Sequence, residues 1–203
     1  MNRNLHWENV YQTKKSTEVS WYESDPKQSL DLIVSVAGET RGRVIDVGGG
    51  QSFLVDRLLD LGFIHVAVLD ISRGAIEATK ARLGVQAAKV RWIVSDITDA
   101  DTLGQFDIWH DRAVLHFLTA PEDQRKYVDL LRNTLSAGGY FIVGAFAKGG
   151  PVKCSGLQVQ QYDEPAMCRL LGSDFEHLRS MSYSHTTPAA KSQLFYFGVF
   201  RRN

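Results

Sequence analysis

The chain has 203 residues, of which 44% are hydrophobic and 23% are charged, the composition of one soluble globular domain. Lys and Arg together number 23, as do Asp and Glu, so the formal net charge of zero argues against nucleic acid or an anionic membrane as a partner. The chain has two cysteines and no CxxC pair, which predicts neither a disulfide framework nor a metal site. The sequence shows no signal peptide and no long apolar run, so we predict a cytoplasmic protein.

Residues 5–22 precede every predicted strand and are rich in aromatic side chains. A short helix packed onto the core by its aromatic face is one explanation. A lid that closes over a bound ligand is the other. The aromatic residues of this segment are Trp7, Tyr11, Trp21 and Tyr22.

Asp25 and Pro26 then open a helix that ends at Gly38. We therefore divide the chain into an N-terminal segment with the candidate lid and this helix, residues 1–38, and a main domain, residues 39–203. The face of the helix expected to pack on the core comprises Leu30, Ile33, Val34 and Ala37.

The most informative stretch is residues 43–52, RVIDVGGGQS. Val44, Ile45 and Val47 are β-branched, as a buried parallel strand requires. The three glycines that follow let the backbone take positive φ and approach a ligand closely. Apolar residues at helical spacing come next and end at Gly62. Strand, glycine turn and helix together predict a nucleotide-type site.

The residues around the glycines indicate the type of ligand. A dinucleotide fingerprint needs a further Gly or Ala where this chain has Phe53, so the fingerprint is incomplete. Asp46 lies two residues before the first glycine, where its carboxylate can meet a positively charged amine. This arrangement favours a cationic ligand over a pyrophosphate.

Two further acids follow the next two predicted strands. Asp70 ends the strand over residues 65–70, where a carboxylate can accept hydrogen bonds from both hydroxyls of a ribose, and Ser72 is the better cap for the next helix. Asp96 follows the third strand and can accept from an adenine amino group, with Ile71 against the adenine face. One acid at a strand end is usually a cap, but three after three successive strands predict a nucleoside site.

The fourth predicted strand, residues 106–110, runs into the sequence DRAVLHFL at residues 111–118. Ligands of doubly wound sheets bind outside the carboxyl ends of the strands, so we expect this segment to face the reacting groups. The guanidinium of Arg112 suits a carboxylate. Alternatively, Asp111 and Arg112 pair only to close the turn.

A nucleophile that carries a proton could lose it to a histidine, and His116 is the best placed candidate, with His110 second. A lone histidine is nonetheless more often a structural residue.

Three more strands are predicted after a helix over residues 121–135. The connection over residues 147–162 is rich in Gly and polar residues, as specificity loops often are. With the four earlier strands this gives a total of seven. The last three predicted strands are residues 140–146, 175–184 and 193–200.

Asp46-Val47-Gly48-Gly49-Gly50 resembles the first motif of class I S-adenosylmethionine-dependent methyltransferases, with Ser52 where that family usually has a third glycine. DRAVLHFL and the tryptophan-containing N-terminal segment resemble thiopurine-methyltransferase-like and type 12-like bacterial methyltransferases. LSAGGYFIV resembles the LKPGG segment and following strand of class I enzymes. The resemblance implies an α/β fold: a Rossmann-like, doubly wound, seven-stranded sheet, mostly parallel with the last strand antiparallel and helices on both faces.

The resemblance also implies S-adenosylmethionine as the cofactor, favours the lid over plain packing, and places the arginine of the fourth strand by the cofactor. No metal is expected, because His110 and His116 lack the spacing of ligands on one helical face. The expected cofactor-binding residues are Trp7, Tyr11, Trp21, Asp46, Gly48, Gly49, Gly50, Asp70, Ile71, Asp96, Ile97, Asp111 and Arg112.

The leading hypothesis is methyl transfer by in-line displacement to the S, N or O atom of a small molecule, because the net charge is zero and the lid is aromatic. The oligomeric state is left open. The alternative within the class is transfer to a protein lysine, since enzymes of that kind resemble the WENVYQTK region. Outside the class, the chain would be a cofactor-binding module without turnover, or a nicotinamide-dependent oxidoreductase.

Overall fold

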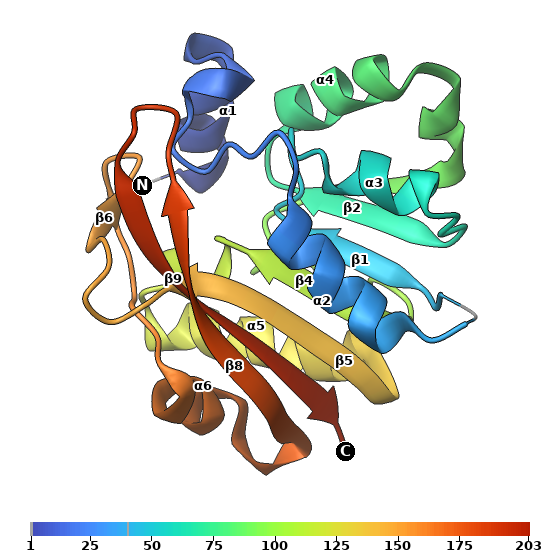
Figure 1. Cartoon of the computed structure of the whole chain (residues 1–203), viewed down its shortest axis with the longest axis vertical. Helices are drawn as coiled ribbons and strands as arrows, with labels where there is room; N and C mark the ends of the chain where they lie inside the picture. The colour runs from blue at the N-terminus through green and yellow to red at the C-terminus, as the bar shows by residue number, and fades with distance from the viewer. Residues whose placement is uncertain (1, 40) are drawn as a thin grey trace.

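The computed structural model describes residues 2–39 and 41–203. Met1, in the predicted N-terminal segment, and Thr40, in the predicted main domain, lie outside the described residues. A seven-stranded sheet with the order β3-β2-β1-β4-β5-β9-β8 forms the centre of the molecule (Figure 1). Its strands are β1 (Val44–Val47), β2 (Val66–Asp70), β3 (Val90–Val94), β4 (Phe106–Arg112), β5 (Leu135–Phe146), β8 (Phe175–Thr186) and β9 (Ser192–Arg202).

The directions of the strands confirm the predicted fold class. The first five strands pair in parallel, whereas β9 is antiparallel to both β5 and β8. All four residues of β1 are buried, as its apolar sequence predicts. The strand order changes direction between β1 and β4, where the two crossover connections diverge and leave a crevice at the carboxyl ends.

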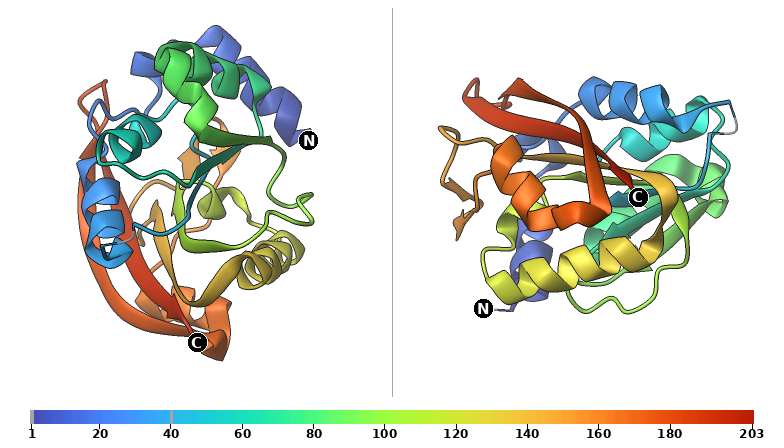
Figure 2. Two further views of the ribbon diagram at one scale, coloured as in Figure 1. Left: turned by 90° about the vertical axis from the view of Figure 1, so that its right-hand side faces the viewer. Right: turned by 90° about the horizontal axis from the view of Figure 1, so that it is seen from below.

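Helices cover both faces of the sheet (Figure 2). α2, α3 and α4 contribute to the cluster of apolar side chains on one face, and α5 and α6 to the cluster on the other. The α-helices are α1 (Arg3–Thr13), α2 (Lys27–Ala37), α3 (Leu54–Asp60), α4 (Arg73–Leu83), α5 (Pro121–Thr134) and α6 (Glu164–Leu171). The short 3₁₀ helices are η1 (Ser16–Glu18), η2 (Gly84–Lys89), η3 (Leu115–Phe117) and η4 (Gly172–Asp174).

Helix α2 differs in detail from its prediction. Val34 was expected on the buried face but is 46% exposed. Ile33 is buried as predicted, and the helix also buries Ser29 and Leu32, because the stripe that it presents to the core is displaced by one residue from the one that the apolar pattern suggested.

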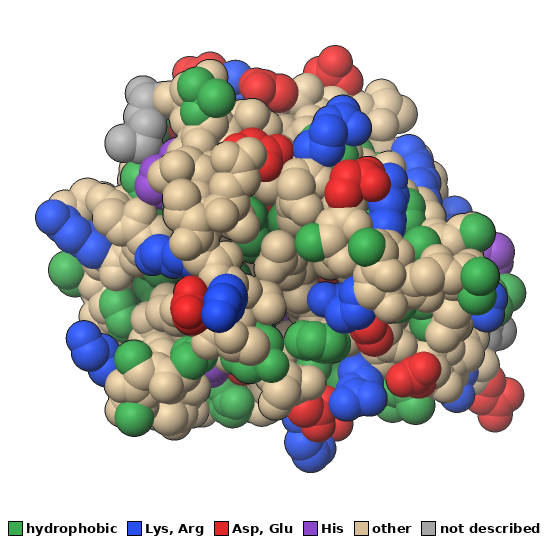
Figure 3. Space-filling model, turned by 90° about the horizontal axis from the view of Figure 1, so that it is seen from above, with side chains coloured by type: hydrophobic (Ala, Val, Ile, Leu, Met, Phe, Trp, Pro, Cys, Tyr) green, Lys and Arg blue, Asp and Glu red, His purple; other side chains and the backbone are tan. Residues whose placement is uncertain are grey.

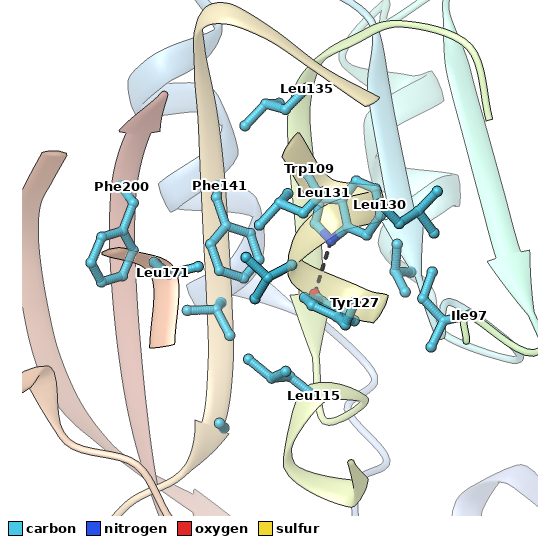
Figure 4. Close-up of a cluster of buried hydrophobic side chains, with 14 of the residues drawn as sticks. Ile97, Trp109, Leu115, Tyr127, Leu130, Leu131, Leu135, Phe141, Leu171 and Phe200 are labelled. Carbon is cyan, nitrogen blue, oxygen red and sulfur yellow. Dashed lines mark hydrogen bonds between the residues drawn. The ribbon is translucent and has the colours of Figure 1, made fainter. Parts of the chain in front are cut away.

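The core on the α5 face extends to the site through a chain of polar side chains. The Trp109 indole N–H donates to the Tyr127 hydroxyl over 3.0 Å, among buried leucines of α5 (Figure 4). Tyr127 in turn donates to Asp111 Oδ2 over 2.6 Å. Asp111 is thereby fixed under the turn that follows β4.

The long connection after β5 folds back over the carboxyl edge of the sheet. It forms a two-stranded hairpin from β6 (Lys153–Cys154) and β7 (Leu157–Gln158). The hairpin buries Cys154 close to the N-terminal segment, with its sulfur 3.8 Å from the Ser20 hydroxyl oxygen.

The surface is consistent with the balanced charge of the sequence. On the face seen from above, basic and acidic side chains alternate, and neither sign gathers into one large patch (Figure 3). Within the described ranges, no helix has both the length and the apolar character needed to cross a bilayer.

Candidate active site

Two adjoining cavities lie at the carboxyl ends of the parallel strands. The first chamber has a volume of about 100 Å³, and the second chamber about 50 Å³. The residues that line both chambers, and so lie between them, are Tyr11, Trp21, Gly48 and Arg112.

The first chamber has two chemically distinct halves. The acidic half lies at the ends of β2 and β3, and the aromatic half at the ends of β4, β5 and β9. The acidic half is lined by Asp70, Ile71, Ser95, Asp96 and Ile97. The aromatic half is lined by His116, Phe117, Phe146, Cys154 and Phe195.

The glycine turn after β1 leaves no room for side chains. Gly48 has a φ of +73°, and a Cβ atom there would lie 2.1 Å from Val114 Cγ2. A Cβ on Gly49 would lie 2.6 Å from Asp46 Oδ2, and one on Gly50 would lie 2.8 Å from Asp70 Oδ2. The turn is therefore open only to a ligand that approaches its backbone.

Asp46 is oriented by a residue that the sequence analysis considered only as a base. Its Oδ1 atom accepts from His110 Nδ1 over 2.7 Å. Its Oδ2 atom is buried and has no hydrogen-bond partner within the described part of the chain. Since Asp46 lines the second chamber, this free oxygen is available to a cationic group bound there.

Asp70 lies at the floor of the acidic half and is 4% exposed. Its Oδ1 atom accepts from the Ser72 backbone N–H over 2.8 Å, and Ser72 caps α4 as predicted. Burial raises the pKa of Asp70 to about 7, with the negative charges of Asp46 and Glu8 adding to the shift. A ligand that donates hydrogen bonds to this carboxylate would favour its ionised form.

Asp96 already has a protein partner. Arg3 Nη1 donates to its Oδ2 atom over 3.3 Å, and the Thr98 backbone N–H donates to its Oδ1 atom over 2.9 Å. Arg3 also pairs with Asp123 at the start of α5. The sequence analysis missed Arg3, which has no local pattern that would indicate a role 93 residues away.

Helix α1 covers the first chamber, and its aromatic residues line the cavity as the lid prediction requires. Trp7 packs edge-on against Phe117 with ring centroids 4.9 Å apart, and against Trp21 at 5.7 Å. Tyr11 lies next to Asp70, and burial followed by the charge of Asp70 holds its pKa well above the ordinary value. The cofactor contacts proposed for these residues stay predictions.

Helix α1 is fastened to the site by its polar residues. Asn4 Nδ2 donates to the Ile71 carbonyl over 2.7 Å. Glu8 accepts from the Arg73 backbone N–H over 2.6 Å and from the Ser72 hydroxyl over 3.0 Å, so its carboxylate caps the N-terminus of α4.

Replacing Glu8 by glutamine should loosen this cover. The charge that favours the helix N-terminus is lost, and we expect cofactor affinity to fall by roughly tenfold through faster dissociation. Stopped-flow measurement of the release of S-adenosylhomocysteine, the demethylated form of the cofactor that the sequence resemblance implies, would test this. Glu77→Gln, an exposed change on the same α4 that removes a Lys80 ion pair, is the control and should leave release unchanged. Equal release rates for Glu8→Gln and the parent chain would contradict the assignment.

Arg112 lies between the two chambers, but its charge is already balanced. Its Nη1 atom donates to the Trp21 carbonyl over 2.9 Å, and its Nη2 atom lies 3.0 Å from Glu23 Oε1. Burial lowers the pKa of Arg112, while Glu23 acts in the opposite direction. The expected pairing with a ligand carboxylate would have to share this guanidinium with Glu23, a partner that the sequence analysis missed.

Asp111 does not face either cavity. Its oxygens accept from the Val114 and Leu115 backbone N–H groups and from Tyr127, and the residue is fully buried. The expected contact with the cofactor is therefore corrected: Asp111 shapes the turn that carries Arg112. The alternative in which Asp111 and Arg112 pair directly is not observed, since Arg112 pairs with Glu23.

His116 lines the aromatic half, but its environment does not suit a base. Burial, together with the charge of Arg112, lowers the pKa of His116 to about 3. Its Nδ1 atom already accepts from the Phe146 backbone N–H over 3.3 Å. The predicted proton-acceptor role is corrected on these two grounds.

Comparisons with known proteins agree with this geometry. Residues 45–141 match the model of a family described as a methyltransferase domain. The malonyl-(acyl-carrier protein) O-methyltransferase of Anoxybacillus flavithermus is 28% identical over 125 residues, which are 60% of this chain and 48% of that protein. The chain therefore matches about half the length of this curated relative.

Two solved structures share the fold. The 1,6-didemethyltoxoflavin-N1-methyltransferase of Burkholderia thailandensis, solved with 1,6-didemethyltoxoflavin and S-adenosylhomocysteine, has a TM-score of 0.71 at 18% identity, covering 98% of this chain and 84% of its own. The N-methyltransferase NodS of Bradyrhizobium japonicum WM9, in complex with S-adenosylhomocysteine, has a TM-score of 0.72 at 14% identity and covers 99% of both chains.

The chain has a seven-stranded sheet with one antiparallel strand, a glycine turn at its switch point and acids at the neighbouring strand ends, which is the arrangement of the methyltransferase fold. The family match over residues 45–141, the curated relative and the shared fold together support the class that the sequence predicts, the class I S-adenosylmethionine-dependent methyltransferases. The predicted class and cofactor are confirmed, and the nicotinamide-dependent alternative is set aside.

Proposed function

We propose that the chain transfers the methyl group of S-adenosylmethionine to a small molecule bound in the aromatic half of the first chamber. The single observation that carries the cofactor part is the Oδ2 atom of Asp46, a residue that lines the second chamber beside the glycine turn: this atom is buried and has no hydrogen-bond partner among the described residues. An amino group is the natural partner for such an oxygen.

The cofactor would extend through both chambers. Asp70 would accept from the ribose hydroxyls, Ile71 and Ile97 would contact the adenine, and Asp46 would hold the amine of the methionine tail. The tail would pass over Gly48, which lines both cavities. When bound, the cofactor supplies a sulfonium methyl group that is already activated for displacement.

The chain contributes position and exclusion of water. Trp7 and Trp21 cover the first chamber and would keep water from the reacting atoms. In the transfer, the lone pair of the acceptor atom would form the new bond to the methyl carbon while the carbon–sulfur bond would break and leave its electrons on sulfur. Arg112, held by Glu23, separates the two chambers and would fix the approach.

A small acceptor is favoured by the enclosed aromatic half. The didemethyltoxoflavin enzyme supports this choice because the 1,6-didemethyltoxoflavin bound in its structure is a small molecule. The two structural neighbours are named as N-methyltransferases, whereas the curated relative is named as an O-methyltransferase. The comparisons therefore leave the acceptor atom open.

The first test is calorimetric titration with S-adenosylmethionine. We expect saturable binding with one site per chain, and no heat at millimolar cofactor would defeat the proposal. Incubation of whole cell lysate with methyl-labelled cofactor then distinguishes the two acceptor classes. Label in small metabolites supports the proposal, and label confined to protein lysines would replace it with the lysine alternative.

A further inference from the structure

His116 has a proton position that the backbone fixes. Its Nδ1 atom lies 3.3 Å from the Phe146 backbone nitrogen, whose N–H donates to it. Because a backbone N–H can only donate, Nδ1 carries the lone pair. The proton of the neutral ring must then be on Nε2. That Nε2 atom is buried and lacks a hydrogen-bond partner among residues 2–39 and 41–203.

The opposite tautomer is unfavourable in this structure. It would set two N–H groups against each other and leave the Phe146 N–H unsatisfied inside the protein. Protonation of both ring nitrogens has the same consequence. The lowered pKa of His116, caused by burial and by Arg112, agrees with a neutral ring.

The surroundings of His116 select for flat, uncharged molecules. Its ring stacks on Phe146 with centroids 4.4 Å apart and an interplanar angle of 13°, and it meets Phe117 edge-on at 4.5 Å. Phe195 packs against Phe146 at 4.8 Å. The described lining of the aromatic half contains no carboxylate, and the charge of Arg112 is balanced by Glu23. A cation would therefore be buried there without a carboxylate partner. An anion would have to compete with Glu23 for the charge of Arg112, whose Nε and Nη2 atoms lack a hydrogen-bond partner in the described part of the chain.

We propose that the acceptor is a flat, uncharged heteroaromatic molecule and that His116 Nε2–H donates a hydrogen bond to one of its ring nitrogens or carbonyl oxygens. This inference rests on the proposed methyl transfer and names its acceptor class. His116 is then a specificity-determining residue: it selects molecules that present an acceptor atom at that place, because any other molecule leaves the buried N–H unpaired.

The assignment has a chemical consequence for the acceptor. With its proton on Nε2 and its lone pair bound to Phe146, His116 has no site that can take a proton from the nucleophile. The acceptor must therefore bring a lone pair that is free at neutral pH, as a ring nitrogen does, and the methylated ring then carries the positive charge that the sulfonium loses.

The tautomer is tested directly by nitrogen NMR. The protein is labelled with nitrogen-15 in its six histidines, and the signals of His116 are assigned by their absence in His116→Gln. At pH 7 we expect Nδ1 without a proton and Nε2 with one. A proton on Nδ1 would overturn the inference. This measurement needs neither cofactor nor acceptor, so it stands even if the proposed function fails.

Recognition is tested with two probes of nearly equal shape, benzimidazole and indole, in protein saturated with S-adenosylhomocysteine. Benzimidazole has a ring nitrogen that accepts a hydrogen bond, and indole does not. We expect benzimidazole to bind about fivefold more tightly by calorimetry. Equal binding, tighter indole binding, or no binding of either probe would overturn the inference.

Two variants separate the hydrogen bond from the packing. His116→Phe keeps a stacked ring beside Phe146 but removes both nitrogens, and it should bind the two probes equally. His65→Phe changes an exposed histidine before β2 and should keep the preference for benzimidazole. If His116→Phe does not fold, the NMR measurement and the comparison of the probes in the unmodified protein still decide. S-adenosylhomocysteine binding without the benzimidazole preference would reject the acceptor class and leave the proposed function intact.

Discussion

Replacing Gly48 by alanine is expected to abolish cofactor binding. The added Cβ would lie 2.1 Å from Val114 Cγ2, and the φ of +73° is unfavourable for any residue with a side chain. Val114 or the turn itself must move, and both line the first chamber. We expect the affinity for S-adenosylmethionine to fall by a factor on the order of 100 or more. The free energy of unfolding should fall by roughly 2–4 kcal/mol, from strain and overpacking together.

Gly62→Ala is the matched control for this prediction. Gly62 has a similar φ of +81°, but a Cβ there would meet nothing within 4 Å. Gly62→Ala should therefore lower the free energy of unfolding by the backbone strain alone, about 1 kcal/mol, and leave the cofactor affinity unchanged. Denaturant unfolding and calorimetry measure the two quantities. If both variants lost stability equally and bound the cofactor normally, the turn would not be the place where the ligand approaches the backbone.

Replacing Asp70 by asparagine should cause the second largest loss of affinity for the cofactor, after Gly48→Ala. The carboxylate lies in the acidic half with its Oδ2 atom beside Gly50 and Tyr11. Hydrogen bonds from ribose hydroxyls to a charged acceptor are worth about 2–3 kcal/mol in total, which corresponds to on the order of 100-fold in the dissociation constant. Asp107→Asn is the control: it removes an acid paired with Arg43 at the opposite end of the sheet and should not affect the cofactor.

The pH dependence of cofactor binding follows from the same residue. In the free protein the pKa of Asp70 is about 7, so the carboxyl is largely protonated below that pH. A ligand that donates to the carboxylate must first displace this proton, and its affinity should fall by about tenfold for each unit of pH below 7. Calorimetry between about pH 5 and pH 7 measures this slope. Asp70→Asn should show no such slope, and a slope that persists in the variant would refute the assignment.

The stability of the cofactor-free protein should fall as pH rises, whereas the affinity for the cofactor should rise. The folded-state pKa of Asp70 is raised from 3.8 to about 7, so between these values the folded protein binds more protons than the unfolded chain. The free energy of unfolding contributed by Asp70 therefore falls as pH rises from about 4 to 7. Asp111, whose pKa is raised to about 6 by burial, adds a slope of the same sign that Asp70→Asn would leave in place.

Local sequence patterns predicted most of the fold. The buried strand before the glycines, the apolar helical spacing after them and the alternating terminal strands are properties of short segments, because hydrophobic periodicity reflects each element's burial directly. Acids placed at successive strand ends must meet at one edge of a parallel sheet, so Asp70 and Asp96 could be assigned to one cavity without coordinates.

The partners of these residues were decided by the tertiary structure. Arg3 reaches Asp96 across 93 residues, and Glu8 caps a helix that begins 65 residues later. Likewise, the backbone of Phe146 fixes the tautomer of His116. By itself the sequence determined that this chain forms a seven-stranded sheet of the methyltransferase type, and it predicted a cofactor site at the glycine turn. Only the folded structure decided which polar groups are paired and which remain free for a ligand, because those pairings depend on distances between segments that no local pattern encodes.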